Sequence, residues 1–136
     1  MPARTISKLA QEAGVHVETV RYYERIGLLE QPERPDEGWR VYSDEAVKRI
    51  RFIKRAQELS LTLDEIHQLI KIGFDLNEAG CAEVRELTDS KRREVSDKIR
   101  SLQAVHSRLK ELVERCDSSE SEEGCPIINA LENPEA

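Results

Sequence analysis

Apolar residues recur at steps of three or four residues along the second half of the chain, the spacing that places them on one face of an α-helix. The apolar members of this run are Val95, Ile99, Leu102, Val105, Leu109 and Leu112. The pattern predicts one continuous helix over residues 81–116, roughly 50 Å long at 1.5 Å per residue. Because a domain this small cannot cover so long a stripe, we expect a coiled coil with the same helix of a second chain, and therefore a homodimer.

Shorter helical patterns precede this helix. Ser7 is expected to cap a helix that ends at Ala13, because Gly14 can take the left-handed conformation that closes a helix. A second helix is predicted from Val17 to Arg25. Two short helices joined by a tight turn have the form of a helix-turn-helix, whose second helix enters a DNA major groove.

The segments that follow complete a small N-terminal domain. Alternation over residues 38–42, after two prolines, predicts a small hairpin wing over 28–42. Further helices are predicted at 44–59 and, from a capping box at Thr62, up to Ile72. The fold class is therefore all-α with a small β wing. The predicted division is a winged helix-turn-helix DNA-binding domain at 1–72, a linker at 73–80, the dimerisation helix at 81–116, and a metal-binding loop with a short C-terminal helix at 117–136.

Composition and charge narrow the class of protein. The 136 residues are 38% hydrophobic and 35% charged, which suits a soluble helical protein. No apolar run has membrane-spanning length, so we expect a cytoplasmic protein without a membrane partner. Residues 1–60 hold eleven Lys and Arg against ten Asp and Glu, whereas residues 61–136 hold ten against seventeen. The net charge of −6 therefore leaves room for a basic face on the N-terminal domain.

Three stretches of sequence carry a recognisable order of residues: TVRYYERIGLL at 19–29, GWRVY at 38–42 and RFIKRAQEL at 51–59. Together they closely resemble the MerR family of bacterial transcription regulators, and the resemblance extends over nearly the whole chain. It implies a winged helix-turn-helix, a long antiparallel dimerisation helix and an effector site at the C-terminal end.

The resemblance also implies which side chains contact DNA. Arg21 on the second helix is expected to reach a guanine edge or a phosphate. Arg40 on the wing and Lys54 on the following helix are expected to bind phosphate, which positions the protein without reading sequence. Without the motif, a solvated surface of mixed charge would be the default interpretation. The full set of expected DNA-contacting residues is Thr19, Arg21, Tyr22, Trp39, Arg40 and Lys54.

Three cysteines carry the candidate effector chemistry. If the long helices run antiparallel, Cys81 of one protomer meets Cys116 and Cys125 of its partner, which gives three thiolates across the dimer. Soft thiolates select soft ions, so mercury, lead, cadmium, copper(I) and zinc are all candidates. Within the family, this cysteine pattern is most similar to that of the mercury(II) regulators. We therefore expect mercury(II) as the effector ion, with lead or another soft thiophilic metal as the alternative.

The function implied by the resemblance is control of transcription by a metal. The dimer is expected to bind double-stranded operator DNA in both states, to repress a mercury-resistance promoter when apo, and to activate it when metal-bound by distorting the DNA for RNA polymerase. Two other classes stay open, a thiol enzyme and a coiled-coil adaptor whose cysteines staple the dimer. The sequence lacks a Cys-x-x-Cys pair and a phosphate-binding glycine loop, so we expect no enzymatic activity.

Overall fold

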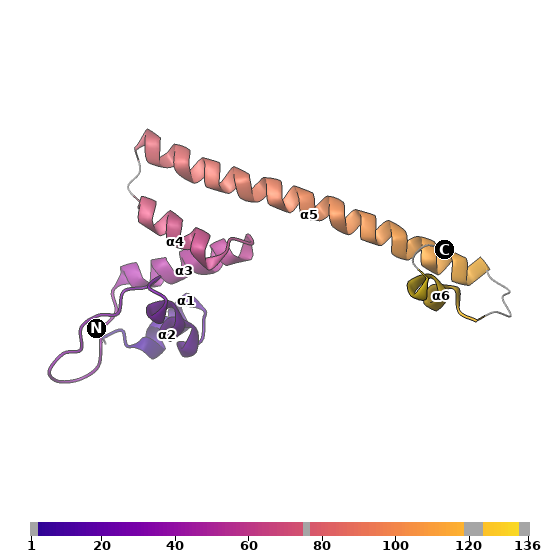
Figure 1. Ribbon diagram of the computed structural model, residues 1–136. Coiled ribbons are helices and arrows are strands. Elements are labelled where there is room, and N and C mark those ends of the chain that lie inside the picture. The colour runs from indigo at the N-terminus through magenta and orange to yellow at the C-terminus, as the bar shows by residue number, and fades with distance from the viewer. Residues whose placement is uncertain (1–2, 75–76, 119–123, 134–136) are drawn as a thin grey trace. The chain divides into compact units, whose positions relative to one another are not determined.

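The computed structural model describes residues 3–74, 77–118 and 124–133, and these residues form helices joined by loops (Figure 1). The chain divides into two compact units, residues 1–88 and 89–136, which are described separately. The helices are α1 (Ile6–Ala13), α2 (Val17–Arg25), α3 (Asp44–Glu58), α4 (Leu63–Ile72), α5 (Glu78–Ser118) and α6 (Pro126–Glu132). Helix α5 includes the whole of the predicted 81–116 helix.

The first unit has a single apolar core between its short helices. Helix α3 packs against α1 and α4, and α1 packs against α2. The large side chains that are less than 2% exposed come from each of these helices and from the loop after α2. They are Leu9, Val20, Leu28, Ile50, Ile53 and Ile66. Removing such side chains from water is the main favourable contribution to folding, so this core holds the two helices of the helix-turn-helix in place.

Local signals explain most of the helix ends. Gly14 ends α1 with φ +72°, a conformation that glycine adopts without a steric penalty. Thr62 and Glu65 form the predicted capping box at the start of α4. The expected cap at Ser7 is wrong: the N-cap is Thr5, two residues earlier, α1 begins at Ile6, and Thr5 makes no side-chain cap hydrogen bond. A favourable residue type therefore predicted the presence of this helix but not its first residue.

The predicted β wing is not confirmed, because residues 28–42, all of them described, contain no strand. This segment is an extended loop. The last residue of the loop is hydrogen-bonded to the N-terminal segment, because the Tyr42 amide donates to the Arg4 carbonyl at 2.9 Å. Pro32 and Pro35 lie on the other arm of the loop and have no amide hydrogen to donate, which weakens pairing between the two arms.

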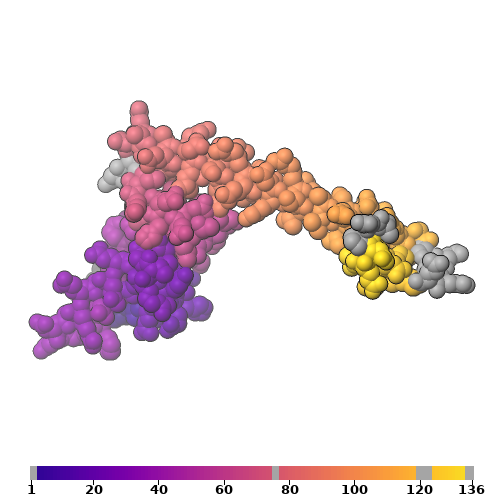
Figure 2. Space-filling model, in the orientation of Figure 1, coloured from indigo at the N-terminus to yellow at the C-terminus, as the bar shows by residue number. Residues whose placement is uncertain are grey.

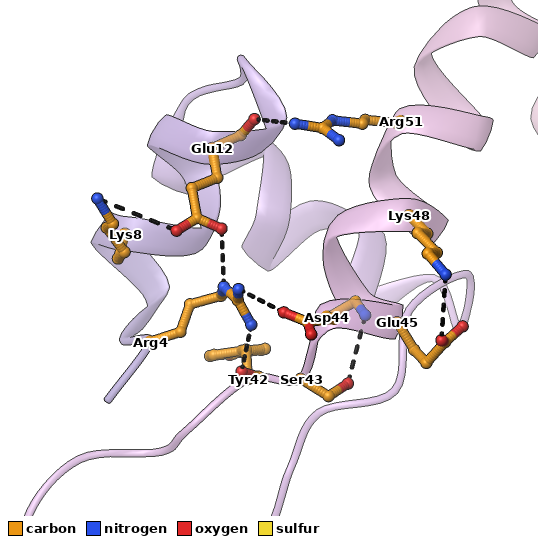
Figure 3. A network of polar contacts seen from close by, with 10 residues as sticks. Arg4, Lys8, Glu12, Tyr42, Ser43, Asp44, Glu45, Lys48 and Arg51 are labelled. Carbon is orange, nitrogen blue, oxygen red and sulfur yellow. Dashed lines mark hydrogen bonds and ion pairs between the residues drawn. The ribbon is translucent and has the colours of Figure 1, made fainter. Parts of the chain in front are cut away.

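One arginine joins four segments of the first unit (Figure 3). The Arg4 guanidinium donates to Glu12 Oε2 on α1 at 2.9 Å, to the Tyr42 carbonyl at 3.1 Å and to Asp44 Oδ1 on α3 at 2.7 Å. The hydrogen bonds to Asp44 and then Glu12 raise the pKa of Arg4. These contacts fix the end of the 28–42 loop against the helices that flank it.

The second unit consists of most of α5 with α6 beside its C-terminal end (Figure 1). In the single chain the apolar stripe of α5 is open to solvent. The part of the helix that carries the stripe is orange in Figure 2. Their exposed fractions are 50% for Ile99, 67% for Leu102, 51% for Val105 and 57% for Leu109. None of the helices in the described residues combines the length and apolarity needed to cross a lipid bilayer.

Candidate DNA-binding surface and thiolate site

Helix α2 is oriented by its buried face. Val20 is completely buried and Tyr23 is 4% exposed, and the Tyr23 hydroxyl donates to Gln57 Oε1 on α3 at 2.7 Å. Because these residues face the core, the opposite side of the helix carries Arg21 and Arg25, both exposed. Tyr23 therefore has a structural role in the core, and the cationic side chains of the second helix lie in solvent.

A groove of about 950 Å³ lies between α2, the N-terminal segment and the 28–42 loop. Four arginines and two glutamates are among the residues that line it, so positive charge predominates. Arg21, Trp39 and Arg40, three of the residues predicted to contact DNA, all line this groove. The complete lining is Thr5, Ile6, Ser7, Glu18, Arg21, Glu24, Arg25, Gln31, Arg34, Trp39, Arg40 and Tyr42.

Two arginines of this groove, Arg25 and Arg34, are not among the residues that the sequence predicts to contact DNA. Arg25 stands four residues after Arg21, a spacing that places two helical residues on the same face, so a sequence signal for Arg25 existed. Its guanidinium lies 5.8 Å from the centre of the Tyr22 ring. Arg34 lies in an irregular loop, where no periodicity indicates direction.

The residues predicted to contact DNA differ in their exposure and in whether they line the groove. Trp39 is 75% exposed, whereas Thr19 is half-buried on α2. Arg40 donates to the Pro32 carbonyl through Nε, at 3.0 Å. Its two terminal nitrogens take no part in this hydrogen bond. Lys54 does not line the groove, and its Nζ donates to the Gly14 carbonyl at 3.0 Å, where it satisfies the end of α1.

The C-terminal unit brings two of the three cysteines together. Cys116 lies in the last turn of α5, and Cys125 immediately precedes α6 as its N-cap. Hydrogen bonds from the backbone amides of Ile128 and Ile127 lower the pKa of the Cys125 thiol, and a hydrogen bond with the Cys116 thiol acts in the same direction. A helix N-terminus of this kind stabilises the thiolate, which is the form that binds metals.

Cys81 belongs to the other compact unit, in the first turns of α5. All three cysteines are free and exposed. Within the described part of a single chain, no group of three or more His, Cys, Asp or Glu side chains is arranged to hold a metal ion. Of the segment 117–136, predicted to hold a metal-binding loop and a short helix, the structure describes 117–118 and 124–133.

A helix-turn-helix with an arginine-lined groove beside its second helix defines a DNA-binding protein, and the family comparisons agree. Residues 4–71 match the MerR helix-turn-helix family of regulatory proteins, and residues 47–112 match the MerR DNA-binding region. The chain belongs to the MerR family of DNA-binding transcription regulators. Members of this family are regulators of transcription and not enzymes.

Relatives of known name cover nearly the whole chain. The mercuric resistance operon regulatory protein of Bacillus cereus is 43% identical over 126 residues, which are 93% of this chain and 95% of that protein. A transcription regulator from Ralstonia metallidurans, solved in complex with lead(II), has 36% identity and a TM-score of 0.78 over 93% of this chain and 97% of its own. The regulator MerR from Bacillus megaterium, solved with mercury(II), has 39% identity and a TM-score of 0.70 over 90% and 94%.

Proposed function

We propose that this protein is a homodimeric, mercury(II)-sensing transcription regulator. In this proposal residues 1–72 bind operator DNA, 73–80 link the parts, 81–116 pair the two chains, and 117–136 complete the metal site. The apo dimer represses a mercury-resistance promoter. The metal-bound dimer activates the same promoter by distorting its DNA so that RNA polymerase engages both promoter elements.

The observation that carries the proposal is the pair of thiols at the C-terminal end. The backbone amides of Ile128 and Ile127, and to a smaller extent the Cys116 thiol, lower the pKa of the Cys125 thiol and so favour its thiolate. Two thiolates and a third from elsewhere form a donor set of sulfur alone, which suits a soft ion such as mercury(II) and disfavours hard ions such as magnesium or calcium. The residues present therefore fit the proposed effector.

The third thiolate is proposed to come from Cys81 of the other protomer. The α5 stripe, with side chains such as Leu102 and Leu109 more than half exposed, supports pairing with a second copy. If the two copies of α5 run antiparallel, the beginning of one lies beside the end of the other. A site shared in this way joins both chains, so an ion bound there can favour one geometry of the dimer over another.

The regulatory step follows from such a difference. An ion shifts an equilibrium between two dimer geometries only to the extent that it binds one more tightly than the other. A coupling of about 1–3 kcal/mol changes the ratio of the two states by roughly 5–150-fold. The DNA-binding domains then hold the operator in a different shape in each state. In this proposal Arg21 and the neighbouring arginines of the groove bind the DNA.

A lead(II) regulator is the competing proposal. It is supported by the 36% identity and TM-score of 0.78 with the Ralstonia protein solved with lead(II). Mercury is favoured because the Bacillus cereus relative of 43% identity is a mercuric resistance regulator. Both ions are soft and thiophilic, so the same three cysteines would serve either one.

The first experiment is a metal titration of the reduced dimer, followed by ultraviolet thiolate absorption in the presence of a competing small thiol. Mercury(II), lead(II), cadmium(II) and zinc(II) are compared in parallel. Retention of mercury against the competitor is expected, with in vitro transcription from the promoter rising only on addition of mercury. Tighter retention of lead, with lead-dependent transcription, would replace mercury by the alternative effector.

The shared site is tested by mixing variants. Cys81→Ser, Cys116→Ser and Cys125→Ser homodimers should each lose metal-induced transcription and keep apo operator binding. A Cys81→Ser chain paired with a Cys125→Ser chain, however, regains one complete site if ligands come from both protomers. After subunit exchange of equal amounts, half of the dimers are mixed, so about a quarter of the parental binding capacity should return. No recovery on mixing would refute the shared site.

A further inference from the structure

Helix α2 is the second helix of the helix-turn-helix and therefore its recognition helix. Polar contacts from α3 and α4 hold its C-terminal end in place. Two of them come from α3, where Gln57 accepts from the Tyr23 hydroxyl at 2.7 Å and Arg49 Nη1 donates to the Leu28 carbonyl at 3.5 Å. Backbone hydrogen bonds from the Leu28 and Leu29 amides to the Tyr23 carbonyl close the turn that follows α2. The end of the helix is therefore attached firmly to α3.

The third contact comes from α4. His67 Nε2 lies 3.3 Å from the carbonyl oxygen of Ile26, the C-cap residue that follows α2. Because a carbonyl can only accept, this hydrogen bond requires the imidazole tautomer with its hydrogen on Nε2. The ring also packs over Gly27, where a Cβ atom would lie 3.6 Å from Nε2 and where φ is +80°. Gly27 thus turns the Ile26 carbonyl toward the half-buried imidazole.

We propose that His67 is a positioning residue that ties the recognition helix to α4 and thereby sets how α2 is presented to DNA. On the neighbouring position of α4, Ile66 is completely buried in the core, so the backbone that carries His67 is itself anchored. Helix α4 ends at Ile72 and is followed by Gly73, with φ +99°. A displacement of α4 would reach the recognition helix through the bond between His67 and the Ile26 carbonyl. The inference rests on the DNA-binding part of the proposed function and not on the identity of the metal.

The test compares two substitutions of His67 in the full-length dimer. His67→Leu keeps a side chain of comparable size and removes the donor. His67→Gln restores an N–H donor at a similar distance from the backbone. Gln68→Leu serves as the matched control, because it removes an exposed polar side chain from the next position of α4. The DNA probes are duplexes selected from a random library by the parent protein, and scrambled duplexes of the same composition.

The expected result separates specific from non-specific binding. His67→Leu should lower affinity for the selected duplexes about three- to tenfold, the loss that corresponds to one hydrogen bond. Affinity for scrambled duplexes should stay unchanged, because phosphate contacts dominate there. His67→Gln should regain most of the specific affinity, and Gln68→Leu should bind like the parent.

Three outcomes would overturn the proposal. They are parental specific affinity in His67→Leu, equal loss in His67→Leu and His67→Gln, and a parallel loss on scrambled duplexes. The second would mean that packing matters and the donor does not. All of these measurements are made without metal, so a failure of mercury sensing would appear separately, as an unresponsive parent protein.

Discussion

Replacement of Tyr42 by Phe removes one hydroxyl from the contact between the 28–42 loop and the recognition helix. The Tyr42 side chain is 4% exposed, and its hydroxyl donates to Glu24 Oε2 on α2 at 3.0 Å. The backbone bonds between Tyr42 and Arg4 do not involve the hydroxyl. The substitution is therefore expected to keep the fold and to release the loop from α2 at a single point.

The magnitude follows from the kind of bond that is lost. A hydrogen bond to a charged group contributes roughly 1.5–3 kcal/mol to stability. Glu24 is only half-buried, so its carboxylate regains water when the hydroxyl is removed, and the loss should lie near the lower end. We expect Tyr42→Phe to reduce the free energy of unfolding by about 1.5 kcal/mol. The assay is denaturant unfolding of parent and variant dimers at equal protein concentration, followed by circular dichroism.

The pH dependence gives a second, independent readout. Burial, and then the hydrogen bond to Glu24, raise the pKa of Tyr42 from 10.0 to about 12. A pKa raised in the folded state means that the neutral phenol stabilises the fold below pH 10. This contribution is lost as the pH rises from 10 to about 12. Phenylalanine cannot ionise, so the stability difference between parent and variant should narrow over that interval.

If the difference in unfolding free energy between the parent and Tyr42→Phe stays constant between pH 8 and pH 11, the role assigned to the Tyr42 hydroxyl is refuted. Tyr22→Phe is the matched control for stability, since Tyr22 lies on α2 with 41% of its surface exposed. A change of less than about 0.5 kcal/mol is expected there. A larger loss in Tyr22→Phe than in Tyr42→Phe would show that the burial of the two rings does not determine their contributions.

Two further predictions concern DNA binding and dimerisation. Arg21→Ala should lower operator affinity about tenfold or more, as expected for loss of a guanidinium contact to DNA, with mercury binding intact, whereas Arg100→Ala on α5 removes the same charge and should bind operator like the parent. Leu102→Lys places a charge on the open stripe of α5 and should shift the protein from dimer to monomer in sedimentation at micromolar concentration. Arg108→Lys, on the same helix, should leave the dimer intact, and a Leu102→Lys protein that stays fully dimeric would exclude this stripe as the interface.

The helices could be predicted from the sequence because their signals are local. The apolar spacing from Val95 to Leu112 lies within one helix, and the structure places it in α5. The capping box at Thr62 and the glycine after Ala13 also act within a single turn. The cysteines could be singled out by residue type alone. Signals of this range do not depend on where the rest of the chain lies.

The contacts that shape the DNA-binding surface depend on segments that are distant in the sequence. Arg4 reaches Asp44 across 40 positions, and His67 reaches Ile26 across 41. The groove that unites Arg21 with Arg34 exists only after the loop has folded beside α2. The predicted strand of the wing, based on alternation at 38–42, does not form, because alternation cannot indicate whether a partner strand is available.

Lys54 illustrates the same limit at a single residue. Its sequence position indicates an exposed cation, which the structure bears out, but its hydrogen bond to the Gly14 carbonyl joins α3 to the end of α1. The sequence by itself determined the helices, the exposed apolar stripe of α5 and the three thiols. Only the tertiary structure decided which arginines share a groove, because that arrangement depends on burying the common core of the first unit, and side-chain periodicity does not specify how helices pack together.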